Sequence, residues 1–276
     1  TNQSKQSQSK QRTSSMATSA TTSSPVEAAS LPLAGRVAIV TGASRGIGRA
    51  IATHLASLGA SLVLGYASSS ELADALAAEL PRAVAVRADV SDEAGVRSLF
   101  DAAESAFGGA AHILVACAGL AIQTYPTLAT TATAEFDAVF AVNTRGAFLC
   151  IREAANRLRR GGGGRIVAVS STLAATLLPG YAAYAASKAA VEAMVRVAAK
   201  ELGPARVTVN CVAPGPVATE LFFQGKSEEA VERFRAGHPM GRLGEVDDIV
   251  PAVGFLCTDA AEWVNGQVIR VNGGIA

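Results

Sequence analysis

The chain has 276 residues, of which 50% are hydrophobic and only 17% are charged. A chain of this length and composition can bury one large hydrophobic core, but it has too few residues for two full domains. A formal net charge of +1 gives no electrostatic reason to bind nucleic acid or an anionic membrane surface. The 4 cysteines stand singly among apolar residues, without metal-ligand spacing. They predict buried thiols, a reducing compartment and no metal site.

Residues 1–30 are rich in hydroxyl side chains: 14 are Ser or Thr, and Glu27 is the only acid. Because no apolar pattern repeats there, we predict a disordered tail. The segment has the Ser-rich, acid-poor composition of an organelle transit peptide, but it contains a single arginine. We therefore prefer an inert extension on a cytoplasmic protein, and we keep a plastid location as the alternative.

From Leu33 onward, short β-branched runs alternate with alanine-rich stretches of helical periodicity. This alternation predicts βαβ units, and runs that are apolar on both faces suit a parallel sheet covered by helices on each side. We predict an α/β fold with one domain over residues 31–276, built on a doubly wound parallel sheet of about seven strands. The predicted strands are Arg36–Thr41, Ser61–Tyr66, Ala83–Ala88, Ile113–Ala116, Arg165–Ser170, Val207–Cys211 and Val268–Val271. The predicted helices are Ile47–Leu58, Ser70–Leu80, Glu93–Phe107, Glu135–Arg160 and Ala182–Leu202.

A glycine-rich turn follows the first predicted strand and leads directly into a helix. The free amide groups and positive dipole end of such a helix can hold a pyrophosphate, and glycines let the backbone approach it closely. The glycine spacing is GxxxGxG and not the GxGxxG fingerprint, so the glycines alone are weak evidence. The prediction of a pyrophosphate site rests mainly on the strand before the turn and the helix after it. The predicted cofactor-binding residues of this turn are Gly42, Ser44, Arg45, Gly46, Ile47 and Gly48.

The end of the second predicted strand decides which nicotinamide cofactor fits. An acidic side chain there would bind the adenosine ribose through its hydroxyl groups. Residues 64–69 contain no carboxylate that would repel a 2′-phosphate, whereas Arg45 and Ser68 can bind one. We therefore predict NADP over NAD, the alternative being that Arg45 is only a solvated loop residue.

Tyr184 and Lys188 lie four residues apart in a predicted helix, on one face. An ammonium held about 4 Å from a phenol, at an effective dielectric near 20, favours the phenolate by roughly 4 kcal/mol, or about three pKa units. Such a tyrosine can exchange a proton with a carbonyl or alcohol oxygen near neutral pH. Among the four tyrosines only Tyr184 has a lysine at this spacing. The alternative is that Tyr184 is only a packed aromatic ring and Lys188 only a solvated charge.

Five features in order resemble the standard-length short-chain dehydrogenase/reductases: the glycine run, Asn143, Ser171 thirteen residues before Tyr184, the Tyr184/Lys188 pair, and Pro214-Gly215. The resemblance runs from about Leu33 to Ala276. Three shorter segments look like the plant NADPH-dependent aldehyde reductase-like members, namely residues 161–166, 214–219 and 262–266.

The resemblance implies a role for each matching residue. It implies that Tyr184 donates the proton, that Lys188 lowers the pKa of Tyr184 and holds the nicotinamide ribose, and that Ser171 hydrogen-bonds the substrate oxygen. Asn143 would link Lys188 to solvent through a water. The further cofactor-binding residues implied are Asp89, Val90, Ala118, Gly119, Pro214, Gly215, Val217 and Thr219. One departure stands out, because Ala116-Cys117 occupies the place where the family has two asparagines.

These observations predict an NADPH-dependent oxidoreductase that reduces an aldehyde or ketone. A 3-oxoacyl-carrier-protein reductase is the alternative within the class, since Arg157, Arg159 and Arg160 could dock an acidic carrier. We prefer the explanation that these arginines are a solvated helix end. An idle NADP-binding module is the alternative of another class.

The substrate is expected beyond the carboxyl ends of the strands, where ligands bind in such sheets. The candidate segments are Leu120–Leu128, Leu173–Tyr181 and Glu220–Met240. Residues 219–243 have the length of a small substrate lid, and its apolar side chains predict a largely apolar carbonyl compound. Those side chains are Phe222, Phe223, Phe234 and Met240, and the equal alternative is that the aromatic ones only pack the lid against the body of the protein. The resemblance also implies a homo-oligomer, a tetramer or a dimer.

Overall fold

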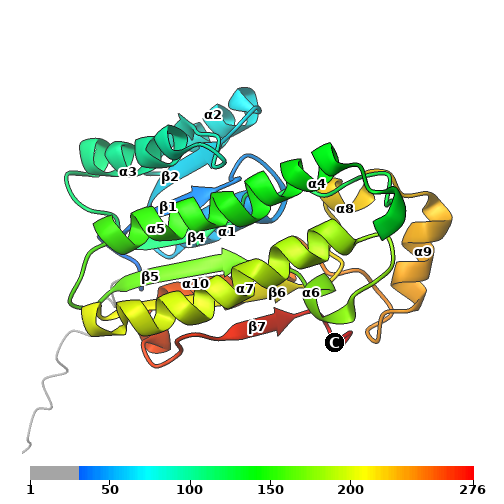
Figure 1. Ribbon diagram of the computed structural model, residues 1–276. Helices are drawn as coiled ribbons and strands as arrows, with labels where there is room; N and C mark the ends of the chain where they lie inside the picture. Colours follow the sequence, from blue (N-terminus) through cyan, green and yellow to red (C-terminus); the bar gives the residue numbers. More distant parts are fainter. Residues whose placement is uncertain (1–30) are drawn as a thin grey trace, which may run out of the picture. The chain divides into compact units, whose positions relative to one another are not determined.

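A computed structural model describes residues 31–276, and the prediction for residues 1–30 lies outside this range. The described residues form a central sheet with helices on both of its faces (Figure 1). The predicted fold class is confirmed. Among the described residues no helix is both long and apolar enough to cross a membrane.

All seven strands are parallel, in the order β3-β2-β1-β4-β5-β6-β7. Strands β1, β2, β4, β5 and β6 are buried along almost their whole length, as their continuous apolar sequences require. The order changes direction between β1 and β4, which marks the switch point of a doubly wound sheet. The strands are β1 (Val37–Thr41), β2 (Ser61–Tyr66), β3 (Ala83–Arg87), β4 (Ile113–Ala116), β5 (Gly164–Val169), β6 (Val207–Pro214) and β7 (Val268–Val271).

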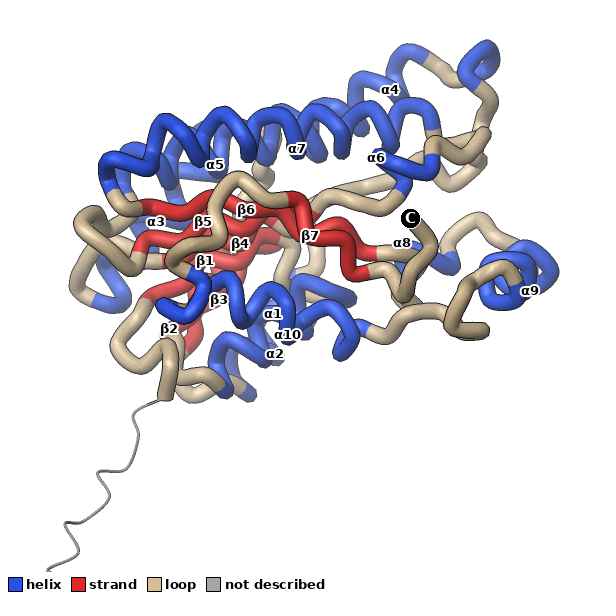
Figure 2. Tube along the Cα trace, turned by 90° about the horizontal axis from the view of Figure 1, so that it is seen from below, coloured by secondary structure: helices blue, strands red, loops and turns tan. Residues whose placement is uncertain are grey.

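Two apolar cores lie on the two faces of the sheet, each closed by three helices (Figure 2). On one face pack α3 (Glu93–Phe107), α5 (Ala147–Arg157) and α7 (Ala182–Leu202). On the other face pack α1 (Gly46–Ser57), α2 (Ser70–Glu79) and α10 (Val246–Cys257). Both faces of the sheet are therefore shielded from water, which leaves the ends of the strands as the place for a ligand.

The predicted helix Glu135–Arg160 is wrong in one respect, because it is two helices joined by a π-helical turn. The parts are α4 (Thr133–Phe140), η2 (Ala141–Gly146) and α5. Gly146 packs against Val90 so closely that an added Cβ would lie 2.7 Å from the Val90 Cγ2 atom. Such π turns occur frequently at functional sites, and this one contains Asn143.

Helix α10 was not predicted. It contains Pro251, which ordinarily argues against a helix interior, but Pro251 stands in the second turn of the helix. A reciprocal capping box between Glu245 and Asp248 satisfies the amide groups at its start. The remaining short helices are η1 (Leu128–Thr130), α6 (Leu173–Thr176), η3 (Gly203–Ala205), α8 (Glu220–Phe223), α9 (Glu228–Ala236) and η4 (Asp259–Ala261).

Candidate active site

A pocket of about 690 Å³ opens at the carboxyl ends of the central strands, at the switch point of the sheet. The structure brings together in it every residue predicted to bind the cofactor. Three of the four predicted catalytic residues, Ser171, Tyr184 and Lys188, also line it. The fourth, Asn143, is buried directly behind the wall, where an added Cβ on Gly119 would lie 3.3 Å from both Asn143 Oδ1 and Lys188 Nζ.

The glycine-rich turn has a shape that only glycine permits. Gly42 and Gly46 adopt positive φ angles of 66° and 55°. A Cβ on Gly48 would lie 2.1 Å from the carbonyl oxygen of Gly42. Arg45 stands at the N-cap of α1 without a side-chain capping bond, which leaves the first amide groups of the helix for a ligand. The turn therefore fits the pyrophosphate of a dinucleotide.

Ser68 and Arg45, which were predicted to meet the adenosine part of the cofactor, both line the pocket. The Arg45 Nη1 atom lies 3.0 Å from both carboxylate oxygens of Glu220. Asp89 also lines the pocket, and its carboxylate accepts hydrogen bonds from the amide and hydroxyl of Ser91. Asp89 thus stabilises its own turn, while the cap of α3 is Asp92.

Thr41, at the end of β1, anchors the backbone just after Ala116, where the chain departs from the family pattern. The buried Thr41 hydroxyl accepts hydrogen bonds from the amides of Cys117 and Ala118, at 3.0 and 3.1 Å. This threonine holds the start of the loop after β4 against the glycine turn. Ala118 also packs on Gly42, where an added Cβ would lie 2.9 Å from the Ala118 Cα atom.

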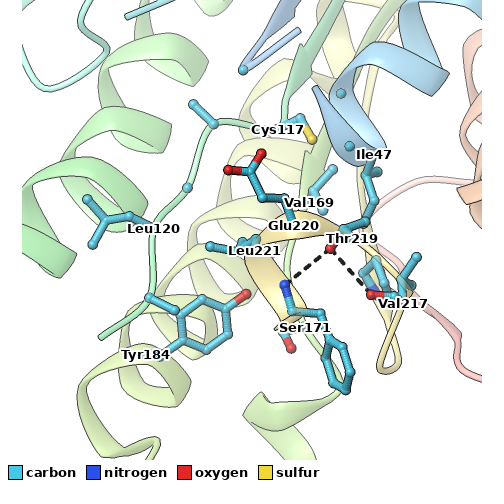
Figure 3. A pocket seen from close by; sticks show the side chains of 18 of the residues that line it. Ile47, Cys117, Leu120, Val169, Ser171, Tyr184, Val217, Thr219, Glu220 and Leu221 are labelled. Atoms are coloured by element: carbon cyan, nitrogen blue, oxygen red, sulfur yellow. Dashed lines mark hydrogen bonds between the residues drawn. The ribbon is translucent and has the colours of Figure 1, made fainter. Parts of the chain in front are cut away.

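Tyr184 and Lys188 project from α7 toward Ser171, which follows β5. Tyr184 directs its hydroxyl into the pocket (Figure 3). The Lys188 ammonium donates a hydrogen bond to the carbonyl oxygen of Val169 at 2.9 Å, and it lies 5.8 Å from the centre of the Tyr184 ring. The pair therefore shares a face of α7, as the spacing predicted.

The predicted lowering of the Tyr184 pKa is wrong for this arrangement. Burial raises the pKa of Tyr184 to about 12, although an interaction with the Ser171 hydroxyl lowers it in part. Burial also lowers the pKa of Lys188, because it disfavours the charged amine. The four-residue spacing did not reveal this burial. A raised pKa favours the protonated phenol, which is the form that the predicted proton donor requires.

Asn143, in the π turn, forms three hydrogen bonds with residues outside that turn. Its Oδ1 accepts from the amide of Leu120 at 2.9 Å, and its Nδ2 donates to the Leu120 carbonyl at 2.9 Å and to Ser187 Oγ at 3.1 Å. Its amide therefore ties the loop after β4 to α7, immediately beside Lys188. Two of these bonds satisfy backbone groups of Leu120, so the Asn143 side chain has a structural role here.

The three predicted substrate segments meet at the far end of the pocket. Phe222 and Phe234 line it, whereas Phe223 and Met240 are exposed and lie outside the lining. The lining residues that were not singled out from the sequence include Tyr125, Tyr181 and Lys226. Each comes from a different segment, and no fixed spacing in the sequence relates them.

Comparison with known proteins supplies the family. A family profile described as Enoyl-(Acyl carrier protein) reductase matches residues 42–276. The chain is 56% identical over 267 residues to the NADPH-dependent aldehyde reductase-like protein, chloroplastic, of Arabidopsis thaliana, covering 92% of this chain and 99% of that protein. It is 54% identical over 252 residues to a short-chain type dehydrogenase/reductase of Picea abies, covering 88% and 93%.

Solved structures agree with the sequence comparison. A short chain dehydrogenase from Burkholderia cenocepacia in complex with NADP superimposes with a TM-score of 0.81. It is 36% identical, and the match covers 88% of this chain and 98% of that chain. With its parallel sheet, its glycine turn and its Ser171, Tyr184 and Lys188 in one pocket, the chain belongs to the short-chain dehydrogenase/reductase family.

Proposed function

We propose that the protein is an NADPH-dependent reductase that converts an aldehyde or ketone into an alcohol. The observation that carries the proposal is one pocket that joins a glycine turn suited to a dinucleotide with the Tyr184, Lys188 and Ser171 side chains. The Arabidopsis relative bears the name of an NADPH-dependent aldehyde reductase-like protein, which supports the same reaction.

The residues divide the work as follows. NADPH, when bound, supplies the hydride for the carbonyl carbon. Ser171 and Tyr184 hydrogen-bond the carbonyl oxygen, and Tyr184 gives it the proton as negative charge develops. Lys188 lies next to Gly119 and Asn143, where it would hold the ribose of a bound cofactor and offset the charge left on the phenolate. Asn143 is a positioning residue, because it fixes the loop beside Lys188.

Selection of NADPH over NADH is assigned to Arg45 and Ser68. Both line the pocket, and residues 64–69 at the end of β2 contain no carboxylate. A guanidinium with its planar donors suits the 2′-phosphate, which NADH lacks.

Tyr184→Phe tests the reaction. NADPH consumption with a panel of aldehydes and ketones is expected to fall by about 10²–10⁴-fold, because the proton donor is gone. Titration of intrinsic fluorescence with NADPH serves as the control, and the variant is expected to bind as wild type does. Wild-type protein that binds NADPH but turns over no carbonyl would contradict the proposal and support an idle binding module.

Docking of an acyl carrier at Arg157 gains no support from the structure. Arg157 forms ion pairs with Asp101, Glu104 and Glu153. It ends α5 just before β5 begins, so it lies at the opposite end of the strands from the pocket. Simple aldehydes are therefore expected to be turned over better than an acylated carrier protein in the same assay.

Location and assembly complete the proposal. We propose a plastid location, since the name of the Arabidopsis relative includes the word chloroplastic. We also propose a homo-oligomer that uses the outer face of α4, α5 and α7. Three apolar side chains on these helices are exposed, Phe136 by 39%, Phe148 by 44% and Val197 by 55%. A second copy would shield them from water.

A further inference from the structure

Lys226 lies at the substrate end of the pocket, surrounded by aromatic rings. Its ammonium is 4.5 Å from the centres of the Tyr125 and Phe222 rings, 5.9 Å from that of Tyr181 and 6.0 Å from that of Phe234. These rings come from three segments far apart in the sequence: the loop after β4, the start of α7, and the helices α8 and α9. The lysine is half-buried and lines the pocket.

The turn that carries Lys226 has little freedom to move. Gly225 has a φ of 72°, and an added Cβ there would lie 2.0 Å from the carbonyl oxygen of Gln123. The Tyr125 hydroxyl donates to the carbonyl of Gln224 at 2.7 Å. Lys226 is therefore built into a defined position and does not hang freely from the surface.

The ammonium of Lys226 has hydrogen-bonding capacity to spare. It donates to Tyr125 Oη at 2.6 Å and to the Phe222 carbonyl at 2.5 Å, which uses two of its three protons. Within residues 31–276 no carboxylate forms a salt bridge with it. Burial without a counterion lowers the pKa of Lys226 to about 8, so the amine is mostly cationic at neutral pH.

The other charged residues that line the pocket have different partners. Arg45 pairs with Glu220, Asp89 stabilises its own turn, and Lys188 lies against Val169 at the catalytic end. The Lys226 ammonium lies 5.9 Å from the ring centre of Tyr181, which stands one helical turn before Tyr184 and 5.1 Å from the Tyr125 ring. A positive charge without a carboxylate partner thus lines the same pocket as Ser171 and Tyr184, at its substrate end.

We propose that Lys226 binds a carboxylate of the substrate, so that the enzyme favours aldehydes or ketones carrying an acid group over neutral carbonyl compounds of the same length. This inference rests on the proposed carbonyl reduction. A carboxylate would take the free proton of the ammonium in a charge-assisted hydrogen bond and neutralise a half-buried cation. A single cation among aromatic rings matches one carboxylate better than a dianionic phosphate. The apolar rings would hold the carbon chain between the two ends.

The test compares matched pairs of substrates in wild type, Lys226→Met and Lys226→Arg. Suitable pairs are succinic semialdehyde with butanal and adipic semialdehyde with hexanal. Wild type is expected to have a higher kcat/KM for the acid of at least one pair. Lys226→Met is expected to lower that preference by about tenfold or more, mainly through KM, since a hydrogen bond to a charge is lost. Lys226→Arg is expected to retain most of it. Lys200→Met, at an exposed lysine of α7, is the matched control.

Two results would overturn the inference. Wild type could show no preference for the acid in either pair, or Lys226→Met could impair acid and neutral aldehyde equally, as a lysine that only tethers α8 to Tyr125 would. Binding measured without turnover separates this inference from the proposed reaction. Hexanoate, but not hexanol, is expected to raise the melting temperature of wild type and not of Lys226→Met. If no aldehyde is reduced while this difference persists, the proposed reaction fails and the anion site stands.

Discussion

Arg45 and Glu220 form an ion pair that joins the glycine turn to helix α8 across the mouth of the pocket. Nη1 of Arg45 lies 3.0 Å from both oxygens of Glu220, and the two side chains are 52% and 58% exposed. Exposed pairs of this kind contribute about 0–1 kcal/mol. The guanidinium is therefore held near the proposed 2′-phosphate site by a contact weak enough for a phosphate to replace.

Changing either partner should alter NADPH affinity in opposite directions. Arg45→Gln is expected to raise the Kd for NADPH about tenfold or more, because the charge that meets the 2′-phosphate is lost. Glu220→Gln is expected to lower this Kd by about two- to fivefold, because the competing carboxylate is removed. Fluorescence titration with NADPH and NADH gives both values.

Arg49→Gln provides the control for these variants. Arg49 lies on α1 beside the same turn, but its guanidinium pairs with Glu79 at 2.7 Å and does not line the pocket. It should leave both affinities unchanged. Equal changes in NADH and NADPH affinity for Arg45→Gln would refute the role assigned to Arg45.

Gly48→Ala is expected to abolish NADPH binding or the fold of the turn. The added Cβ would lie 2.1 Å from the Gly42 carbonyl oxygen, and neither backbone can move without displacing the turn. We expect a loss of about 3 kcal/mol or more in the free energy of unfolding, measured with urea. Gly109→Ala, where nothing lies within 4 Å of the added atom, should behave as wild type. A Gly48→Ala protein with normal stability and affinity would contradict this account.

Elements with a strong local signal could be predicted from the sequence. The strands β1, β2 and β4 are continuous apolar runs that no helix pattern fits, and their observed bounds match the predicted ones within one residue. Helix α7 was likewise predicted with its exact bounds, since its length and alanine content are unambiguous. The residues of the glycine turn were identified because strand, glycines and helix adjoin in the chain.

Features set by distant contacts could not be predicted in this way. The π turn at Ala141–Gly146 interrupts a pattern that reads as one helix, and it is fixed by contacts with Val90 and Leu120. The pKa of Tyr184 is raised because the folded protein buries its side chain. The four-residue spacing to Lys188 gives no information about this burial. The aromatic surroundings of Lys226 require contacts between residues about one hundred positions apart, such as Lys226 with Tyr125.

Asn143→Ala is expected to weaken both stability and catalysis. It would remove three hydrogen bonds and leave the Leu120 amide and carbonyl without partners, for a loss of about 2–3 kcal/mol in unfolding free energy. If kcat per folded molecule is still lower than that of wild type, the result would support a role of Asn143 in positioning Lys188. Asn156→Ala, at an exposed asparagine of α5, is the control. If kcat of the folded Asn143→Ala variant equals that of wild type, Asn143 has a structural role only.

Phe148→Glu tests the proposed assembly. Phe148 lies on α5, 44% exposed, with the Arg152 guanidinium 5.4 Å from its ring centre. A buried glutamate in an apolar contact between copies would disfavour association. Light scattering after size-exclusion chromatography is expected to show a smaller species for this variant than for wild type. Leu72→Glu, at an exposed leucine of α2 on the other face of the sheet, should leave the size unchanged. A wild-type monomer would disprove the assembly.

The four cysteine thiols should react slowly with a disulfide reagent in the native protein. Burial raises the pKa of Cys150, Cys211 and Cys257 to about 12 and that of Cys117 to about 11. At pH 8 the reactive thiolate fraction is then on the order of 10⁻³ or less. Labelling is expected to be far slower than for glutathione and to reach all 4 thiols only after denaturation. Cys117 should react first, since it alone lines the pocket, and NADPH should slow it. Rapid labelling of several thiols in folded protein would show that the cores open.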